Sequence, residues 1–141
     1  MQIDAHTGEI QDGFVAYISP KRNNGFTKGW LAMSQPNGNL KLAHANISGQ
    51  AHRVLHMLLA NVDYENHISR PQSEMASELG LPSSNFSRAV TELVTEGVIE
   101  RGAKSGRVTA LKLNPFYGWK GSAKNHVIAL DAIRKEKKKT Q

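Results

Sequence analysis

The sequence predicts an α+β fold, and three observations lead to that prediction. A long stretch with helical apolar periodicity occupies residues 48–62, and shorter helical stretches follow at residues 72–79 and 84–96. Two short apolar strands, residues 98–101 and 107–113, come directly after these helices and are joined by a glycine-rich connector. Turn-forming residues also divide the first forty residues into short segments.

Composition restricts the class of protein. The 141 residues suffice for one domain, and the absence of cysteine excludes disulfides and thiolate metal sites. No apolar run approaches the roughly 20 residues of a membrane span, and the polar, acidic N-terminus is unlike a signal peptide, so we expect a cytoplasmic protein without a membrane partner. The net charge is +6, but residues 134–139 hold five cations and one acid, which leaves 13 Lys/Arg, 11 Asp/Glu and a net charge of +2 elsewhere. A nucleic-acid partner must therefore be argued from where the charges lie.

The N-terminal part is predicted to be an arm followed by a small β-meander. Residues 1–12 show no periodicity and are expected to form a flexible arm. Residues 13–20 and 26–34 read as two strands, with an Asn-Gly hairpin turn between them. A second turn at residues 36–39 precedes either a third strand or the start of a helix. We assign residues 13–121 to one domain.

The helices have recognisable boundaries. Residues 48–62 carry one continuous apolar face, made of Ala51, Val54, Leu55, Leu58, Leu59 and Val62. Pro71 suits the first position of the next helix, because its missing N–H costs nothing there. Gly80 ends that helix, and Gly97 ends the helix at residues 84–96.

The C-terminal part is predicted to be a helix within residues 122–134, continuing towards residue 137, and a basic tail, residues 135–141. An aromatic loop precedes it, and we expect Tyr117 and Trp119 to pack over the base of the hairpin. The helix has more apolar surface than a lone terminal helix should expose. Either it packs on its own domain or it pairs with a second copy. We favour a homodimer, because dimers suit DNA sites made of two half-sites.

The helix at residues 84–96 indicates a function. Its apolar side carries Phe86, Ala89, Val90, Leu93 and Val94, and its other side carries Ser84, Ser87, Arg88, Thr91 and Thr95, with Asn85 and Glu92 at the edge. Short hydroxyl side chains allow close approach to DNA, and Asn or Arg can read base edges. Two helices joined by a glycine turn, followed by a cationic hairpin, predict a winged helix-turn-helix that binds double-stranded DNA. The predicted contacts are Ser83, Ser84, Asn85, Ser87, Arg88 and Thr91 on the helix, Arg101, Lys104 and Arg107 on the wing, and Arg70 and Lys120 as weaker phosphate contacts.

These residues also resemble known families. QSEMASELGLPSSNFSRAVTELVTEGVIER is similar to the winged helix-turn-helix of catabolite-activator and MarR-like regulators. A wider similarity, to RepL-type plasmid replication and maintenance proteins, adds an early TGEI, the stretch RVLHMLLANVDYENHIS and the closing LKLNPFYGWKG. The resemblance covers roughly residues 46–121. It implies sequence-specific DNA binding in replication initiation, copy control or autoregulation, with Ser84, Asn85, Ser87 and Arg88 as contacts.

Other functions find less support in the sequence. His52 and His56 have a metal-binding spacing, but Arg53 stands where a zinc protease has glutamate, so no metal is expected. The sequence has no phosphate-cradling glycine loop, no nucleophile elbow and no paired carboxylates in an apolar context, so we expect neither an enzyme nor a bound cofactor. A transcriptional regulator or copy-control factor is preferred slightly over a replication initiator, which would also need host replication proteins as partners. A winged helix that binds another protein instead of DNA is the alternative from a different class.

Overall fold

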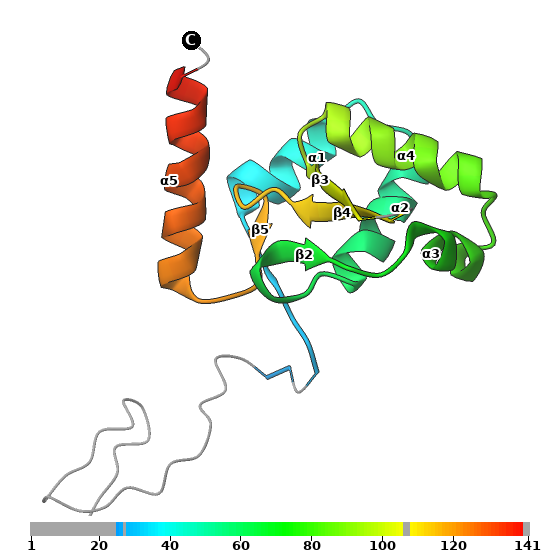
Figure 1. Ribbon diagram of the computed structural model, residues 1–141, viewed down its shortest axis with the longest axis horizontal. Coiled ribbons are helices and arrows are strands. Elements are labelled where there is room, and N and C mark those ends of the chain that lie inside the picture. Colours follow the sequence, from blue (N-terminus) through cyan, green and yellow to red (C-terminus); the bar gives the residue numbers. More distant parts are fainter. Residues whose placement is uncertain (1–24, 27, 106–107, 140–141) are drawn as a thin grey trace, which may run out of the picture.

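The computed structural model describes residues 25–26, 28–105 and 108–139, without the side chains of residues 103–105, 108 and 139. The described part of the chain combines five α-helices with two small antiparallel sheets (Figure 1), which confirms the α+β class. The elements are β1 (Ala32–Met33), the π-helix η1 (Gln35–Leu40), α1 (Lys41–His44), α2 (Gly49–Ala60), the 3-10 helix η2 (Tyr64–Asn66), β2 (His67–Ile68), α3 (Gln72–Leu79), α4 (Ser83–Thr95), β3 (Ile99–Ser105), β4 (Val108–Leu113), β5 (Gly118–Trp119) and α5 (Ala123–Lys139).

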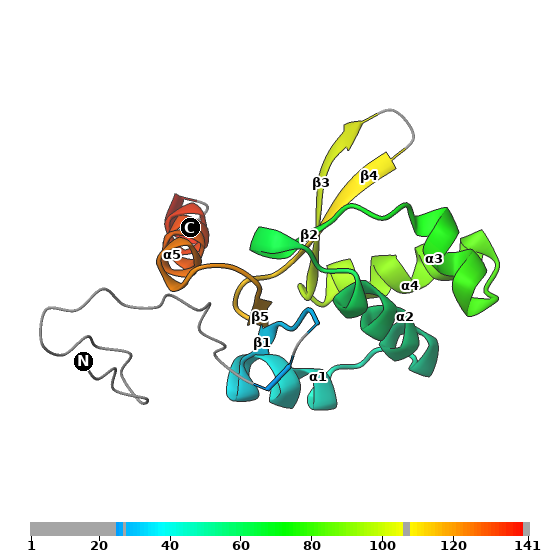
Figure 2. The same cartoon turned by 90° about the horizontal axis from the view of Figure 1, so that it is seen from below.

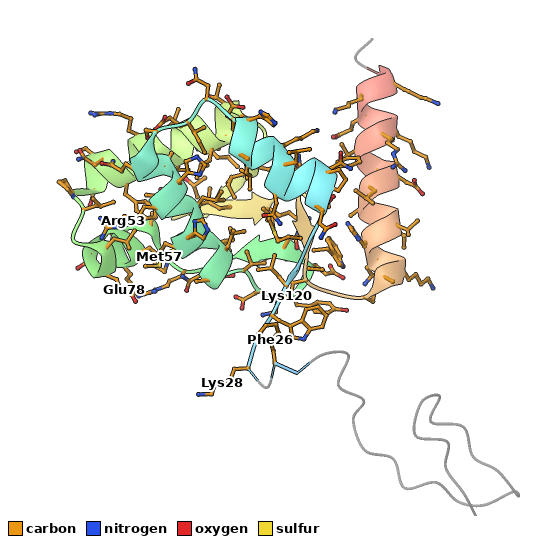
Figure 3. The ribbon with its side chains drawn as sticks, turned by 180° about the vertical axis from the view of Figure 1, so that it is seen from behind. Phe26, Lys28, Arg53, Met57, Glu78 and Lys120 are labelled. Carbon is orange, nitrogen blue, oxygen red and sulfur yellow. The ribbon has the colours of Figure 1, made fainter. Side chains whose placement is uncertain are left out.

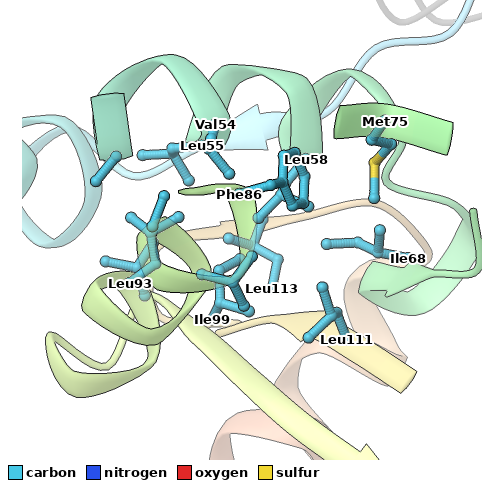
Figure 4. Packing of buried hydrophobic residues seen from close by; sticks show 14 of the residues in the cluster. Val54, Leu55, Leu58, Ile68, Met75, Phe86, Leu93, Ile99, Leu111 and Leu113 are labelled. Carbon is cyan, nitrogen blue, oxygen red and sulfur yellow. The ribbon is translucent and has the colours of Figure 1, made fainter. Parts of the chain in front are cut away.

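Helix α2 is at the centre of the core. Its N-cap is Ser48, whose hydroxyl accepts a hydrogen bond from the N–H of Ala51 at 3.0 Å. The predicted apolar face is buried, with Val54 and Leu58 fully inaccessible to solvent. This face packs against α4 and the sheet, as the close view of the core shows (Figure 4). The apolar period of residues 48–62 thus identified the helix correctly, with small errors at its ends.

Strands β2, β4 and β3 form one antiparallel sheet in that order. In the hairpin, Ile99 pairs with Leu113 and Ser105 with Val108, and the register shifts between Arg101 and Lys104. Seen from below, this hairpin projects from the helical body (Figure 2), as a wing does. Strand β3 continues to residue 105, so the connector that we expected to begin at residue 102 is largely strand.

The predicted β-meander is wrong in the described part of the N-terminal region. Only the two residues of β1 are extended strand there, and β1 pairs with β5 instead of with a sequence neighbour. The supposed second turn is helical, because Ser34 caps η1 by accepting from the N–H of Asn37 at 3.1 Å. Gly38 in η1 lies against the Tyr117 carbonyl, where an added Cβ would come within 2.5 Å. The predicted arm, and the strand at residues 13–20 with its turn, lie outside the described residues.

Helix α5 stands beside the winged domain (Figures 1 and 2), and its residues His126 and Arg134 contact the loop that precedes it. The His126 ring stacks on Trp119 with centroids 4.9 Å apart, and Asn125 donates a 2.7 Å hydrogen bond to Glu65. Tyr117 and Trp119 are buried, as expected of packing residues, but Trp119 lies under α5. Another face of α5 is open, because Val127 and Ile128 are each 57% exposed. No helix in the described part of the chain combines the length and apolarity that crossing a membrane requires.

Candidate nucleic-acid interface

The helix-turn-helix is formed by α3, a short turn and α4. Gly80 ends α3 with φ 69° and ψ 27°, a left-handed conformation that glycine adopts without a steric penalty. Pro82 then stands immediately before α4, with its φ of −58° close to the fixed value of the proline ring. Gly97, at φ 82°, ends the α4 region and leads the chain into the wing. Both predicted helices are present, with boundaries within one residue of those expected, and a glycine follows the end of each as predicted.

Helix α4 has two chemically distinct faces. Its core face, consisting of Phe86, Ala89, Val90 and Leu93, is at most 1% exposed. Its outer face presents Ser83, Ser84, Ser87, Arg88, Thr91 and Thr95 to solvent, with Asn85 partly buried at the edge. Arg88 makes no ion pair with any described residue. The outer face is therefore a hydrogen-bonding surface with one arginine near its N-terminal half.

The serines at the start of α4 are not its caps. The N-cap position is occupied by Pro82, and no side chain there accepts from the first turn of the helix. Capping is the usual structural reason for small polar residues at a helix start. Because Ser83 and Ser84 do not perform that role, their exposed hydroxyls and their backbone N–H groups are available to an outside acceptor such as a phosphate. The N–H groups of Asn85 and Phe86 already donate to the Pro82 carbonyl.

The wing is tied to α4 by a side-chain contact. Arg101 of β3 donates a 2.8 Å hydrogen bond to the hydroxyl of Thr91, which itself donates to the Ser87 carbonyl. A shallow hollow between α4 and the wing is lined by Gln72, Ser87, Arg101, Gly102 and Thr109. A guanidinium has five N–H donors, so one bond to Thr91 positions Arg101 and leaves most of its donor capacity for phosphate.

The structure therefore groups Ser87, Thr91 and Arg101 into one site, and it adds two residues that sequence reasoning missed. Gln72 and Thr109 reach the hollow from α3 and β4. Neither carried a signal in the sequence beyond being polar, because their relevance depends on how three separate elements meet.

Other predicted contacts lie apart from this hollow. Arg70 pairs with Glu74 and Glu78 on the exposed side of α3, so two carboxylates already balance its charge. Lys120 lies at the opposite end of the domain, beside Phe26 (Figure 3), and its ammonium donates to the Val62 carbonyl at 3.3 Å. Lys104 is in β3, but its side chain is not described, and Arg107 lies outside the described residues.

Glu92, at the edge of the outer face, has a structural partner. Its carboxylate accepts hydrogen bonds from the hydroxyl of Ser48 at 2.8 Å and from the Ser48 N–H at 3.0 Å. These two bonds, the hydroxyl first, hold the pKa of Glu92 below its ordinary value. The contact fastens α4 to the start of α2, and it keeps the negative charge engaged at the rim of the surface.

Comparison with known proteins agrees with this geometry. Residues 45–107 match the model of the MarR family. The match spans α2, η2, β2, α3, α4 and β3, and leaves out β1, η1, α1, β4, β5 and α5. It indicates a DNA-binding transcription regulator, and it confirms the winged helix as the core of the fold. A search of curated proteins found no match.

The histidines that the sequence singled out do not form a metal site in the described part of the chain. Among the described residues, no three His, Asp or Glu side chains gather in a way that could hold a metal ion. The His52 and His56 pair is engaged locally, since Nδ1 of His56 lies 2.9 Å from the His52 carbonyl oxygen. The hollow between α4 and the wing is thus the best-supported functional feature of this domain.

Proposed function

We propose that the protein is a sequence-specific double-stranded DNA-binding regulator in which α4 enters a major groove. Arg88 and Asn85 would read base edges, and the hydroxyls of Ser83, Ser84 and Ser87 would bind phosphates or bases. Arg101, held by Thr91, together with Lys104 and Arg107 on the wing, would contact the flanking backbone. Arg70 and Lys120 remain weaker phosphate candidates, because one is ion-paired and the other lies away from α4.

The chemistry of the outer face of α4 carries this proposal. A surface that binds another protein needs exposed apolar anchors. The large apolar residues that are exposed in the described part of the chain are Phe26, Trp30, Leu40, Tyr64, Val127 and Ile128. None of them lies on α4, which presents hydroxyls and an arginine instead. This distribution favours DNA over a protein partner for this face.

The active form that we propose is a homodimer. The open side of α5, with Val127 and Ile128 each 57% exposed, would be covered by a second copy. Two copies related by a two-fold axis would place two α4 helices on half-sites about one helical turn apart. A palindromic operator is the corresponding expectation for the DNA.

The setting that we propose is a plasmid or another mobile element, on the basis of the resemblance of residues 46–121 to RepL-type proteins. The match to the MarR family supports transcription regulation, and within the plasmid setting we place this role, or copy control, ahead of replication initiation. The two roles predict different binding positions, because a regulator occupies a promoter and an initiator occupies an origin and recruits host replication proteins.

Selection of bound fragments from random DNA and from plasmid DNA tests these proposals together. We expect a palindromic site near a promoter, whereas a site confined to an origin would indicate the initiator. On the selected duplex, Arg88→Ala should weaken binding by about 1–3 kcal/mol and relax the base preference. Lys124→Ala, which removes an exposed charge from the first turn of α5, is the control. Unchanged affinity of the Arg88 variant, with base preference intact, would reject α4 as the reading element.

A further inference from the structure

A second surface of the protein lies apart from α4 and the wing. A groove of about 1020 Å³ lies between the chain segment formed by residues 26 and 28–34, the loop at residues 115–121 and α5, and we call it the α5 groove. No described residue of α4 or of the wing lines it. It also lies outside the segment that matches the MarR family, apart from Tyr64.

Exposed aromatic rings gather in the α5 groove. Phe26 is 70% exposed, Trp30 is 43% exposed and Tyr64 is 59% exposed, and all three line it. These are all of the exposed aromatic residues among the large apolar side chains of the described residues. Buried Trp119 and the half-buried His126 ring stacked on it also contribute to the lining. Aromatic rings that are left open to water in one place are suited to stacking with planar groups of a ligand.

The charge of the α5 groove is positive. Lys28, Lys120 and Arg134 line it, and no Asp or Glu is among the described residues of its lining. Lys28 and Lys120 lie near Phe26 at one end of the domain (Figure 3). The Lys120 ammonium bonds to a carbonyl, which carries no net charge, and the 3.4 Å pair of Arg134 with Asp131 is exposed and therefore weak. An occupant with regularly spaced negative charges would complement this lining.

The length of the α5 groove limits the occupant further. Ala123 and Arg134 both line it, and eleven helical steps at 1.5 Å place them roughly 16 Å apart along α5. One small planar molecule would leave most of that length empty. A nucleic-acid strand advances about 3.4 Å per nucleotide when its bases are stacked, so the groove is long enough for several nucleotides.

We infer that the α5 groove binds single-stranded DNA, with bases stacked on Trp30, Tyr64 and Phe26 and phosphates held by Lys28, Lys120 and Arg134. Aromatic platforms beside a cationic track are the general means by which proteins hold single strands without reading their sequence. A second copy is a weaker candidate for this groove, because Val127 and Ile128, the open apolar residues of α5, do not line it. RNA is also a weaker candidate for this groove. Apart from Tyr64, the described lining has two uncharged hydroxyl or amide side chains, Ser34 and Asn37, that could bond a 2′-hydroxyl.

The test is fluorescence anisotropy of a labelled oligothymidylate of about twelve nucleotides at low salt, with the full chain. We expect Trp30→Ala and Tyr64→Ala each to weaken binding at least about five-fold, because a base–ring stack contributes about 1–3 kcal/mol. Trp30→Phe keeps a ring and should retain the affinity. Lys28→Gln should weaken binding and reduce its dependence on salt.

Matched controls separate the α5 groove from the duplex surface. Leu40→Ala removes another exposed apolar side chain, and Lys124→Gln removes another exposed charge, and neither residue lines the groove. Arg88→Ala should weaken duplex binding and leave oligothymidylate binding unchanged. The inference is overturned if the wild type does not bind oligothymidylate, or if Trp30→Ala and Tyr64→Ala bind it as tightly as the wild type. It is also overturned if Leu40→Ala or Arg88→Ala lowers the affinity for oligothymidylate as much as the Trp30 and Tyr64 variants do. Tighter binding of an oligouridylate of the same length would overturn the assignment to DNA.

Discussion

Replacing Asn66 with alanine should destabilise the whole fold. Asn66 is the one fully buried polar side chain among the described residues. Its amide donates to the carbonyls of Leu113 and Gly118 at 2.9 and 2.8 Å, and its side-chain oxygen accepts from the N–H of Lys120 at 2.9 Å. One side chain therefore joins η2 to the end of β4 and to the β5 region, which lie 47 to 54 residues further along the chain.

The magnitude follows from the groups that the substitution leaves without partners. A buried donor or acceptor without a partner costs about 1–3 kcal/mol, and three backbone groups lose their bond to Asn66. The backbone at Asn66 has φ 68°, which asparagine tolerates better than alanine by about 1 kcal/mol. We count the carbonyls of Leu113 and Gly118 at about 1.5 kcal/mol each and add about 1 kcal/mol for the backbone. The expected loss in the free energy of unfolding is then about 4 kcal/mol, a large part of the roughly 5–15 kcal/mol that stabilises a domain.

Urea unfolding followed by far-ultraviolet circular dichroism measures this loss. Asn66→Gly should be about 1 kcal/mol less destabilised than Asn66→Ala, because glycine relieves the strain but restores no hydrogen bond. Asn61→Ala is a matched control, since the Asn61 amide bonds to the Met57 carbonyl within the same helical turn, and we expect a cost below about 1.5 kcal/mol. A loss at Asn66 no larger than the loss at Asn61 would refute the reasoning.

Three further predictions concern charge, pH and assembly. Lys104→Ala on the wing should weaken binding to all duplex sequences alike. In titrations at several salt concentrations, it should also reduce the slope of log affinity against log salt concentration by about one. The pKa of Glu92 is lower in the folded state, so its bonds to Ser48 stabilise the protein at a pH above the ordinary glutamate pKa. This stabilisation is lost as the pH falls through the folded pKa. The melting temperature of Glu92→Gln should therefore decrease less on acidification than that of the wild type. Val127→Asp with Ile128→Asp should shift sedimentation towards the monomer without unfolding the domain, and an unchanged sedimentation coefficient would contradict the proposed dimer face.

Local patterns predicted the helical core well. The apolar period of α2, the glycine stops at Gly80 and Gly97 and the two faces of α4 all depend on residues within a few positions of one another. The wing was recognisable because its strands follow each other directly. Its length was underestimated, since β3 continues through Gly102, a residue that usually marks a turn.

Features that depend on distant contacts were not predictable. Strand β1 is only two residues long, and its partner is Trp119, near the other end of the chain. The Pro-Asn-Gly-Asn stretch has the chemistry of both a turn and a helix start. In its helical conformation, Gly38 lies against Tyr117, a residue that is distant in sequence. The bond from Arg101 to Thr91 and the α5 groove arise in the same way, because segments that share no local pattern meet there. The predicted DNA contacts themselves remain predictions.

The distribution of charge connects the two halves of the proposed mechanism. On the duplex surface, Arg88 and Arg101 are exposed cations, Lys104 and Arg107 are expected to join them, and Arg70 is balanced by carboxylates. If Arg88 reads bases, the three wing cations correspond to a salt slope of roughly −3 per copy, which is modest for a specific regulator. A single copy would therefore gain little affinity from charge, and specificity would depend on the hydrogen bonds of α4. The proposed pairing through Val127 and Ile128 of α5 would double both contributions, which is how two copies could compensate for a weakly charged reading surface.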